Sequence, residues 1–211
     1  MQSSFTSDFL RSHLLTPLFL FILLALLLEF GAVDLWLADL VYRLSGASWS
    51  LRDAWLTNDL IHGGGRVLVA AGAVLLLLAA ACSLFFKSWR KWRQGLFYLL
   101  ASVIGSALII NILKELTHID CPWDLLRYGG TQEYVRNFAD LPIHMTPGAC
   151  FPAGHASAGW AWFGLYFFAI EYAPRWRKSI LSFVLLLGLI FGLGQQLRGA
   201  HFLSHDLWTA G

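Results

Sequence analysis

The chain has 211 residues, of which 57% are hydrophobic and only 13% are charged, and its formal net charge is +2 at pH 7. The charged share is about half of the quarter that soluble globular domains usually carry. This composition excludes an ordinary soluble domain, and so small a net charge gives no indication of a nucleic-acid partner.

Five long apolar segments follow one another along the chain, at residues 14–36, 67–86, 96–113, 156–172 and 180–197. A helix needs roughly 20 predominantly apolar residues to cross the hydrocarbon core of a bilayer. Backbone polar groups within lipid must be satisfied inside the segment, which favours helices. The sequence therefore predicts an all-α fold: a polytopic bundle of about six transmembrane helices, in a single domain over residues 1–211. The sixth helix should open at residues 205–210, and we expect it to be truncated because the sequence stops at Gly211.

Two short connections are rich in Lys and Arg, at residues 87–93 and 175–178. The positive-inside rule places both in the cytoplasm, together with the N-terminus. Segments 37–65 and 115–155 then lie outside. The first of these should contain amphipathic helical pieces along the membrane surface, and Gly63-Gly64-Gly65 should form a hinge before the second span.

Polar residues collect at the outer ends of three predicted spans. They are Lys114 at the end of the third, Gly154 and His155 just before the fourth, and Arg198, His201, His205 and Asp206 after the fifth. Ionisable residues at such places are functional candidates. Cations and a helix N-terminus hold phosphate oxygens. One histidine can attack phosphorus, a second can protonate the leaving oxygen, and a carboxylate can orient the attacking ring.

This arrangement resembles the type 2 phosphatidic acid phosphatase superfamily, whose pattern is K-x6-RP, then PSGH, then SR-x5-H-x3-D. Lys114 is followed, after six intervening residues, by Cys121-Pro122. The run Phe151-Pro152-Ala153-Gly154-His155 matches the second motif, with alanine in place of serine. The run Gly199-Ala200-His201-Phe202-Leu203-Ser204 resembles the third motif and makes His201 the candidate nucleophile. The resemblance covers the chain from about residue 95 onward.

The chain departs from the family pattern at three positions: the first-motif arginine is Cys121, the third-motif arginine falls at Gln195, and the third-motif aspartate falls at His205. Arg127 and Arg198 are the candidates to supply the missing cations. Asp206, one position after His205, is the candidate carboxylate.

The resemblance implies a mechanism. Lys114, Arg198, Arg127 and the amide of Gly154 would hold the phosphate. His201 would attack and form a phosphohistidine, oriented by Asp206 or His205, and His155 would protonate the leaving group. The family needs no metal and no cofactor. The implied substrate is a phosphomonoester or diphosphate on a phospholipid or isoprenoid lipid, and the implied location is a bacterial inner membrane with the active site on the periplasmic face.

Several alternatives stay open at this point. In another register His205 is the nucleophile, but Thr209 then stands where the aspartate is wanted. The spacing His201-x3-His205 also suits zinc, with Asp206 and His155 as further ligands. The missing arginines favour a catalytically impaired member that binds a lipid phosphate, and the same residues would serve phosphate transfer from one lipid to another. A transporter is disfavoured because transporters keep polar residues near the midplane.

The three cysteines predict one disulfide. Cys121 and Cys150 both fall in the outer segment 115–155, where an oxidising compartment permits a disulfide. Cys82 lies within the second span and should stay free. A Cys121–Cys150 bond would tie the first motif to the second.

Overall fold

The computed structural model describes residues 7–140, 142 and 146–211, and within them it contains helices, turns and loops but no β-strand. The longer helices are α2 (Thr16–Phe30), α3 (Val33–Leu44), α4 (Gly65–Phe85), α5 (Arg93–Thr117), α7 (Gly164–Tyr172) and α8 (Arg177–Leu197). The shorter ones are α6 (Gly154–Trp160), α9 (Leu203–Ala210), the π-helices η1 (Arg11–Leu15) and η2 (Trp55–Gly64), and the 3₁₀ turns η3 (Lys87–Trp92), η4 (Pro122–Asp124), η5 (Leu126–Tyr128), η6 (Ala161–Phe163) and η7 (Pro174–Trp176). The predicted all-α class is confirmed.

Four helical stretches in the described residues are long and apolar enough to cross a membrane: Ser7–Phe30, Trp55–Phe85, Lys87–Asp124 and Pro174–Leu197. They contain most or all of the first, second, third and fifth spans predicted from the sequence. Many of their large apolar side chains are exposed. Such a surface is unfavourable in water and matches lipid, so the chain is a membrane protein.

The fourth predicted span is also helical, but it occupies the centre of the bundle. Helices α6, η6 and α7 follow one another without a break, and α6 packs closely on α8, where a Cβ added to Gly159 would lie 2.8 Å from the Cα of Gly188. Ala156 and Ala169 have no exposed surface. Small residues of this kind let membrane helices approach closely. Because its neighbours cover it, this segment has less need of lipid-facing apolar side chains, and it is not among the four stretches above.

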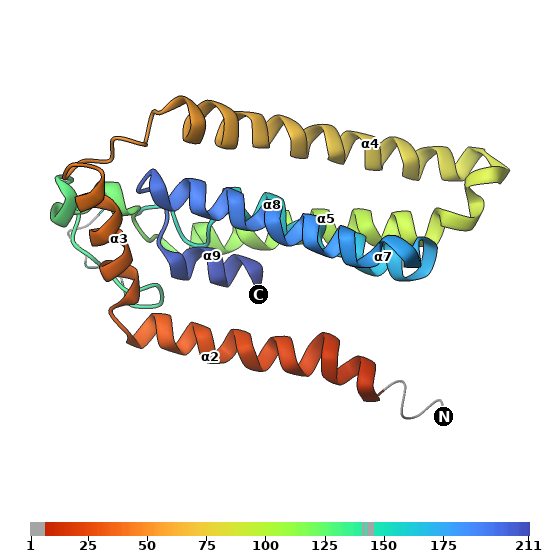
Figure 1. The fold of residues 1–211 in the computed structure, drawn as a ribbon, viewed down its shortest axis with the longest axis horizontal. Coiled ribbons are helices and arrows are strands. Elements are labelled where there is room, and N and C mark those ends of the chain that lie inside the picture. Colours follow the sequence, from red (N-terminus) through yellow and green to blue (C-terminus); the bar gives the residue numbers. More distant parts are fainter. Residues whose placement is uncertain (1–6, 141, 143–145) are drawn as a thin grey trace.

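The predicted end of the first span is wrong. Helix α2 ends at Phe30, the backbone turns at Gly31 (φ −84°, ψ 157°), and α3 then runs across the end of the bundle (Figure 1). Asp34, in the first turn of α3, is buried and accepts a hydrogen bond of 2.9 Å from the backbone N–H of Ser204, near the start of α9. The length of an apolar run cannot predict this helix end, because it does not show that the Asp34 carboxylate accepts a hydrogen bond from the first turn of α9.

The predicted hinge at Gly63-Gly64-Gly65 is also wrong, because η2 continues directly into α4 as one helical stretch. The last glycine serves close packing instead. A Cβ on Gly65 would lie 2.7 Å from the ring of Phe191 on α8. The glycine therefore lets this helix approach α8 at the point where η2 becomes α4.

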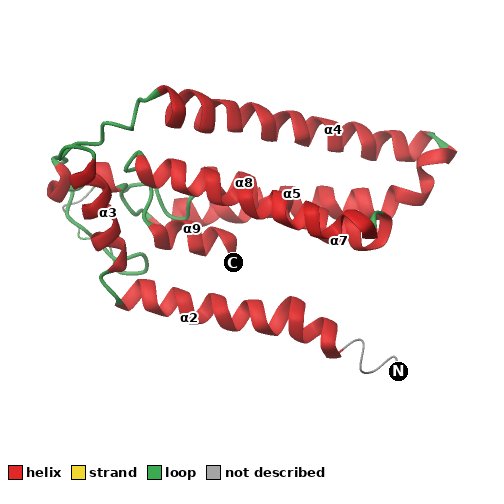
Figure 2. Ribbon diagram, in the orientation of Figure 1, coloured by secondary structure: helices red, strands yellow, loops and turns green. Residues whose placement is uncertain are grey.

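The bundle has two different ends. The basic turns η3 and η7 lie at one end, on the same side as the start of α2, and α3, α9 and the start of α6 lie at the other (Figure 1). Most of the loops gather at the α3 end (Figure 2). Between the two ends, buried side chains of α4, α5, η6 and α8 form an apolar core: Leu76, Ala80, Leu96, Leu99, Trp162 and Val184. The polar residues singled out in the sequence are carried by the α3 end.

Candidate active site

Lys114 lies against the N-terminus of α6. Its Nζ donates a hydrogen bond of 2.7 Å to the carbonyl oxygen of Ala149. A Cβ added to Gly154 would lie 2.9 Å from Cε and 3.4 Å from Nζ of Lys114. The glycine therefore leaves room for the lysine head, and a cation and a helix N-terminus are combined at one point, which favours an anion.

His201 and His205 form a buried imidazole pair. Their Nδ1 atoms are 3.4 Å apart and their ring centroids 5.6 Å apart. His205 has no exposed surface and is packed edge-on between the rings of Phe151 and Phe202. The carbonyl oxygen of His205 accepts a hydrogen bond of 3.2 Å from the backbone N–H of Ala153, which joins the third motif to the second.

The electrostatic environment of His201 favours its neutral form. Burial, and after it the charges of His205 and Lys114, hold the pKa of His201 well below its usual 6.5, and His155 acts in the same direction. A contact with the backbone of Cys150 partly opposes this shift. His201 is therefore uncharged at neutral pH, and Lys114, His155 and His205 all lie close enough to influence its charge. A neutral imidazole has the lone pair that a nucleophile needs.

His155 is held between two helices. Its Nε2 lies 3.2 Å from the carbonyl oxygen of Ile61 on η2, and its ring packs on that of Phe191, with centroids 4.4 Å apart. The carbonyl can only accept, so Nε2 carries a proton and Nδ1 is the nitrogen left for proton exchange. A second imidazole, that of His62, lies beside it with a centroid separation of 4.6 Å.

Arg198 is buried and is bonded to other parts of the chain. Its Nε donates to the carbonyl oxygen of Arg52 (2.8 Å), Nη2 to Oδ1 of Asn58 (2.9 Å) and Nη1 to Oε1 of Gln195 (3.2 Å). The structure thus places Arg198 in a polar cluster with η2. No hydrogen bond joins it to Lys114 or His201 among the described residues.

Asp206 is bonded to Gln196 and not to His201. Its Oδ2 accepts a hydrogen bond of 2.5 Å from Nε2 of Gln196, and its buried Oδ1 has no partner in the described part of the chain. Of the two residues predicted to orient His201, the one within hydrogen-bonding distance is His205.

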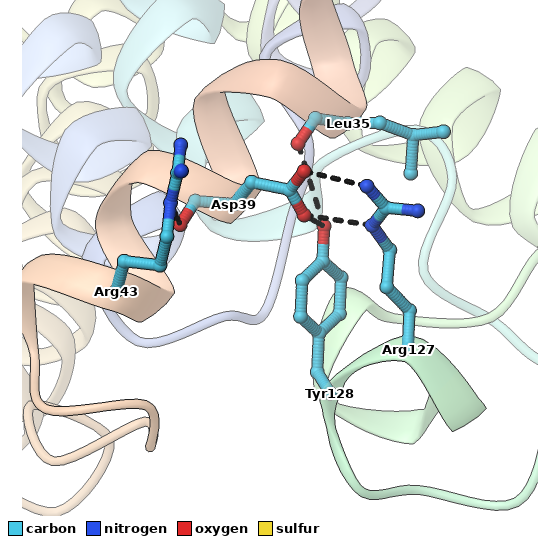
Figure 3. A network of polar contacts seen from close by, with 5 residues as sticks. All are labelled: Leu35, Asp39, Arg43, Arg127 and Tyr128. Atoms are coloured by element: carbon cyan, nitrogen blue, oxygen red, sulfur yellow. Dashed lines mark hydrogen bonds and ion pairs between the residues drawn. The ribbon is translucent and has the colours of Figure 1, made fainter.

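Arg127 is used elsewhere. Its Nε and Nη2 donate to the two carboxylate oxygens of Asp39 on α3, at 2.7 and 2.6 Å, and the hydroxyl of Tyr128 donates to the same carboxylate at 3.0 Å (Figure 3). The guanidinium of Arg127 holds the pKa of Asp39 below its usual range. Arg127 was expected to replace the first-motif arginine. In the structure its guanidinium is instead bonded to the carboxylate of Asp39, and this bidentate pair joins η5 to α3.

Cys121 and Cys150 are joined by a disulfide, with Cα atoms 5.2 Å apart, and Cys82 is free. The separation is within the usual range for a disulfide. The backbone N–H of Cys150 also donates to the carbonyl oxygen of Ile119 at 2.8 Å. Together these bonds tie the segment after Lys114 to the segment before His155.

The described residues provide no third ligand for a metal ion beside His201 and His205. Within residues 7–140, 142 and 146–211, no group of three or more His, Cys, Asp or Glu side chains is placed to hold a metal ion. His201 and His205 supply two imidazoles, whereas zinc sites in proteins use three or four protein ligands. The zinc alternative gains no support from this geometry.

Reasoning from the sequence missed the contribution of η2. Asn58 and His62 on this helix contact Arg198 and Gln195 at the end of α8. The available signal was the spacing of Asn58 and His62, four residues apart at the start of an apolar helix, where polar side chains on one face are unusual.

Comparison with known proteins identifies the family. The model of the PAP2 superfamily matches residues 95–210, a stretch that contains Lys114, His155 and His201. No curated protein and no solved structure matches the chain. The match covers more than half of the sequence and includes all three motif regions on the α3 end of the bundle. The chain therefore belongs to the PAP2 superfamily, whose members are phosphatases.

Proposed function

We propose that this protein is a membrane phosphatase that removes phosphate from a lipid head group, and that the reaction takes place at the α3 end of the bundle. The observation that carries the proposal is the position of Lys114. Its ammonium lies against Gly154 at the start of α6 and acts electrostatically on His201. A phosphate held there would meet a cation, a helix N-terminus and a neutral imidazole together.

The first half-reaction uses two histidines. His155 takes up a second proton at Nδ1 from the medium when the anionic substrate binds. A ring nitrogen of His201 then attacks phosphorus, the bond between phosphorus and the lipid oxygen breaks, and His155 gives its Nδ1 proton to the departing oxygen. Lys114 compensates the charge on the phosphoryl oxygens, which is the main contribution a protein makes to phosphoryl transfer. The product of this step is a phosphohistidine at His201 and the free lipid alcohol or, from a diphosphate, the lipid monophosphate.

The second half-reaction returns the enzyme to its starting state. His155, now neutral at Nδ1, takes a proton from water, and the resulting hydroxide attacks the phosphohistidine. The bond between nitrogen and phosphorus breaks, and inorganic phosphate leaves. His205, within 3.4 Å of His201, orients the nucleophile through both steps.

The fold supports a substrate that is anchored in the bilayer. Apolar helices surround the centre of the bundle, and the candidate site lies at one of its ends, where a lipid head group would be presented. The basic turns η3 and η7 lie at the opposite end. By the positive-inside rule the site then faces the outer side of a bacterial inner membrane. The proposed substrates are the phosphomonoester or diphosphate of a phospholipid or isoprenoid lipid.

The test is phosphate release by the purified protein in detergent micelles, measured over a panel of phosphatidic acid, phosphatidylglycerophosphate, lipid A phosphates and an isoprenoid diphosphate. We expect turnover of at least one of them and none with His201→Ala. Binding of the lipids without turnover would favour the catalytically impaired alternative. Transfer of labelled phosphate to an added acceptor lipid, in place of release, would favour the phosphotransferase alternative.

A further inference from the structure

Helix η2 and the end of α8 meet through two polar pairs. Nη2 of Arg198 donates to Oδ1 of Asn58 at 2.9 Å, and Nε2 of Gln195 donates to Nδ1 of His62 at 2.7 Å. Asn58 and His62 are about one turn apart on η2, and Gln195 and Arg198 are about one turn apart at the C-terminal end of α8, where Arg198 is the C-cap. Helix η2 lies outside the family match at residues 95–210, so no family motif gives these contacts a role. π-Helical segments are rare and occur frequently at functional sites.

The chain of contacts determines which nitrogen of His62 carries its proton. Arg198 can only donate, and its Nη1 lies 3.2 Å from Oε1 of Gln195. The amide oxygen of Gln195 therefore faces Arg198, and its NH₂ group faces His62. Since that NH₂ group donates to Nδ1 of His62, the neutral imidazole carries its proton on Nε2.

The same contacts place this ring beside His155, with centroids 4.6 Å apart. Helix η2 approaches His155 closely at two further points. The carbonyl oxygen of Ile61 is 3.2 Å from Nε2 of His155, and a Cβ on Gly65 would lie 3.3 Å from Cε1 of the same ring. The Nε2–H of His62 has no hydrogen-bond partner among the described residues, and the side chain is only half-buried. It is an oriented donor beside the histidine that would handle the leaving group.

We propose that His62 is a phosphate-binding residue of this site, whose Nε2–H donates to an oxygen of the substrate phosphate beside His155. The inference rests on the proposed function, since it deepens the description of the same site. The family pattern places an arginine where this chain has Gln195. Here the shorter amide holds an imidazole from another helix, and that imidazole supplies the donor which an arginine would otherwise provide.

The experiment measures binding of inorganic phosphate to the full-length protein in detergent, by titration followed with ³¹P NMR. His62→Ala should weaken phosphate binding about 10-fold or more, the effect expected for a hydrogen bond to a charged group. His62→Phe keeps a ring against His155 but has no N–H, so it should weaken binding to the same extent and serves if the alanine variant is unstable. Asn58→Ala is the matched control, because it removes a contact between η2 and α8 of the same kind without removing a donor beside His155. It should change phosphate binding far less.

A second variant tests the equivalence with the family arginine. Adding Gln195→Arg to His62→Ala should restore phosphate binding, and no restoration would overturn the idea that His62 stands in for that arginine. Binding by His62→Ala and His62→Phe equal to that of the wild type would overturn the proposal, as would an equal loss in Asn58→Ala, which would make His62 only a tether. Lipid turnover is measured in the same preparations. Phosphate binding that depends on His62, without any turnover, would sink the proposed function and leave this inference standing.

Discussion

The Nδ1 atoms of His201 and His205 lie 3.4 Å apart, and both side chains are buried. Two imidazole nitrogens share a hydrogen bond only when one carries a proton and the other does not. Each ring therefore constrains the proton position of the other. In the proposed reaction this contact orients the nucleophile, a task that the family pattern gives to an aspartate.

This pair gives the sharpest mutational prediction. His201→Ala should lower kcat for phosphate release by roughly 10⁴-fold or more, because it removes the nucleophile. His205→Ala should cost about 100-fold and leave measurable turnover, because the nucleophile stays and only its orientation is lost. Phosphohistidine is hydrolysed in acid, so an acid quench is unsuitable and labelled phosphate trapped on the protein is measured under alkaline conditions. A labelled His201→Ala variant together with an unlabelled His205→Ala variant would assign the nucleophile to His205.

The loss of phosphatase activity at acid pH should occur below pH 6.5, the usual pKa of histidine. Burial, His205 and Lys114 lower the pKa of His201, so the neutral, attacking form persists as the pH falls below 6.5. Activity is then lost only as the pH falls through the lowered pKa, which is seen in kcat/KM of the free enzyme. Lys114→Met removes a charge that lowers this pKa, and the acid limb of its residual activity should move to higher pH. A limb unchanged by Lys114→Met would show that Lys114 does not act on the titrating group.

The disulfide between Cys121 and Cys150 should stabilise the fold. Closing a loop across 29 residues of sequence restricts the unfolded chain by about 3–4 kcal/mol in the entropic description. Cys121→Ser and Cys150→Ser should each lower the unfolding midpoint, and a reducing agent should lower the wild type to the same value without affecting the variants. Cys82→Ser is the control and should behave as the wild type. In unreduced wild type a thiol reagent should label Cys82 alone. Quantitative labelling of all three cysteines would contradict the disulfide.

The pair formed by Arg127 and Asp39 should matter little for catalysis. Arg127→Ala and Asp39→Ala should each change the free energy of unfolding by no more than about 1 kcal/mol, because the arginine is exposed and the aspartate is partly exposed to solvent. The two variants should have the same KM for a lipid phosphate. A rise in KM with Arg127→Ala and none with Asp39→Ala would return Arg127 to the phosphate site. The double variant completes a thermodynamic cycle that isolates the pair itself.

Metal removal separates the two chemistries that His201 and His205 suggest. Treatment with EDTA followed by gel filtration should leave phosphate release unchanged, because Lys114 and the start of α6 supply the positive potential that the phosphate needs. Loss of activity that is restored by added zinc, and not by magnesium, would assign the histidine pair to a metal site.

The outline of the fold could be read from the sequence because it depends on local properties. The length of an apolar run decides whether a helix can cross lipid, and four of the predicted segments lie mostly or wholly within helical stretches that meet this requirement. The motif spacing was likewise sufficient to recognise the family, since Lys114, His155 and His201 lie in three matched regions. The ends of helices were less predictable, because the start of α3, just after the turn at Gly31, is bonded to α9 through Asp34 and Ser204, which are 170 residues apart.

The partners of the polar side chains were decided only by the tertiary structure. Arg127 pairs with Asp39 across 88 residues of sequence, and Gln195 with His62 across 133. No run length or motif spacing encodes such pairs, because they depend on which helices pack together and at what rotation about their axes. The sequence by itself therefore determined the membrane-helical class, the family and the candidate nucleophile. The packing of η2 against α8 alone decided that His62 lies beside His155, because small residues such as Gly65 and Gly194 let the two helices approach.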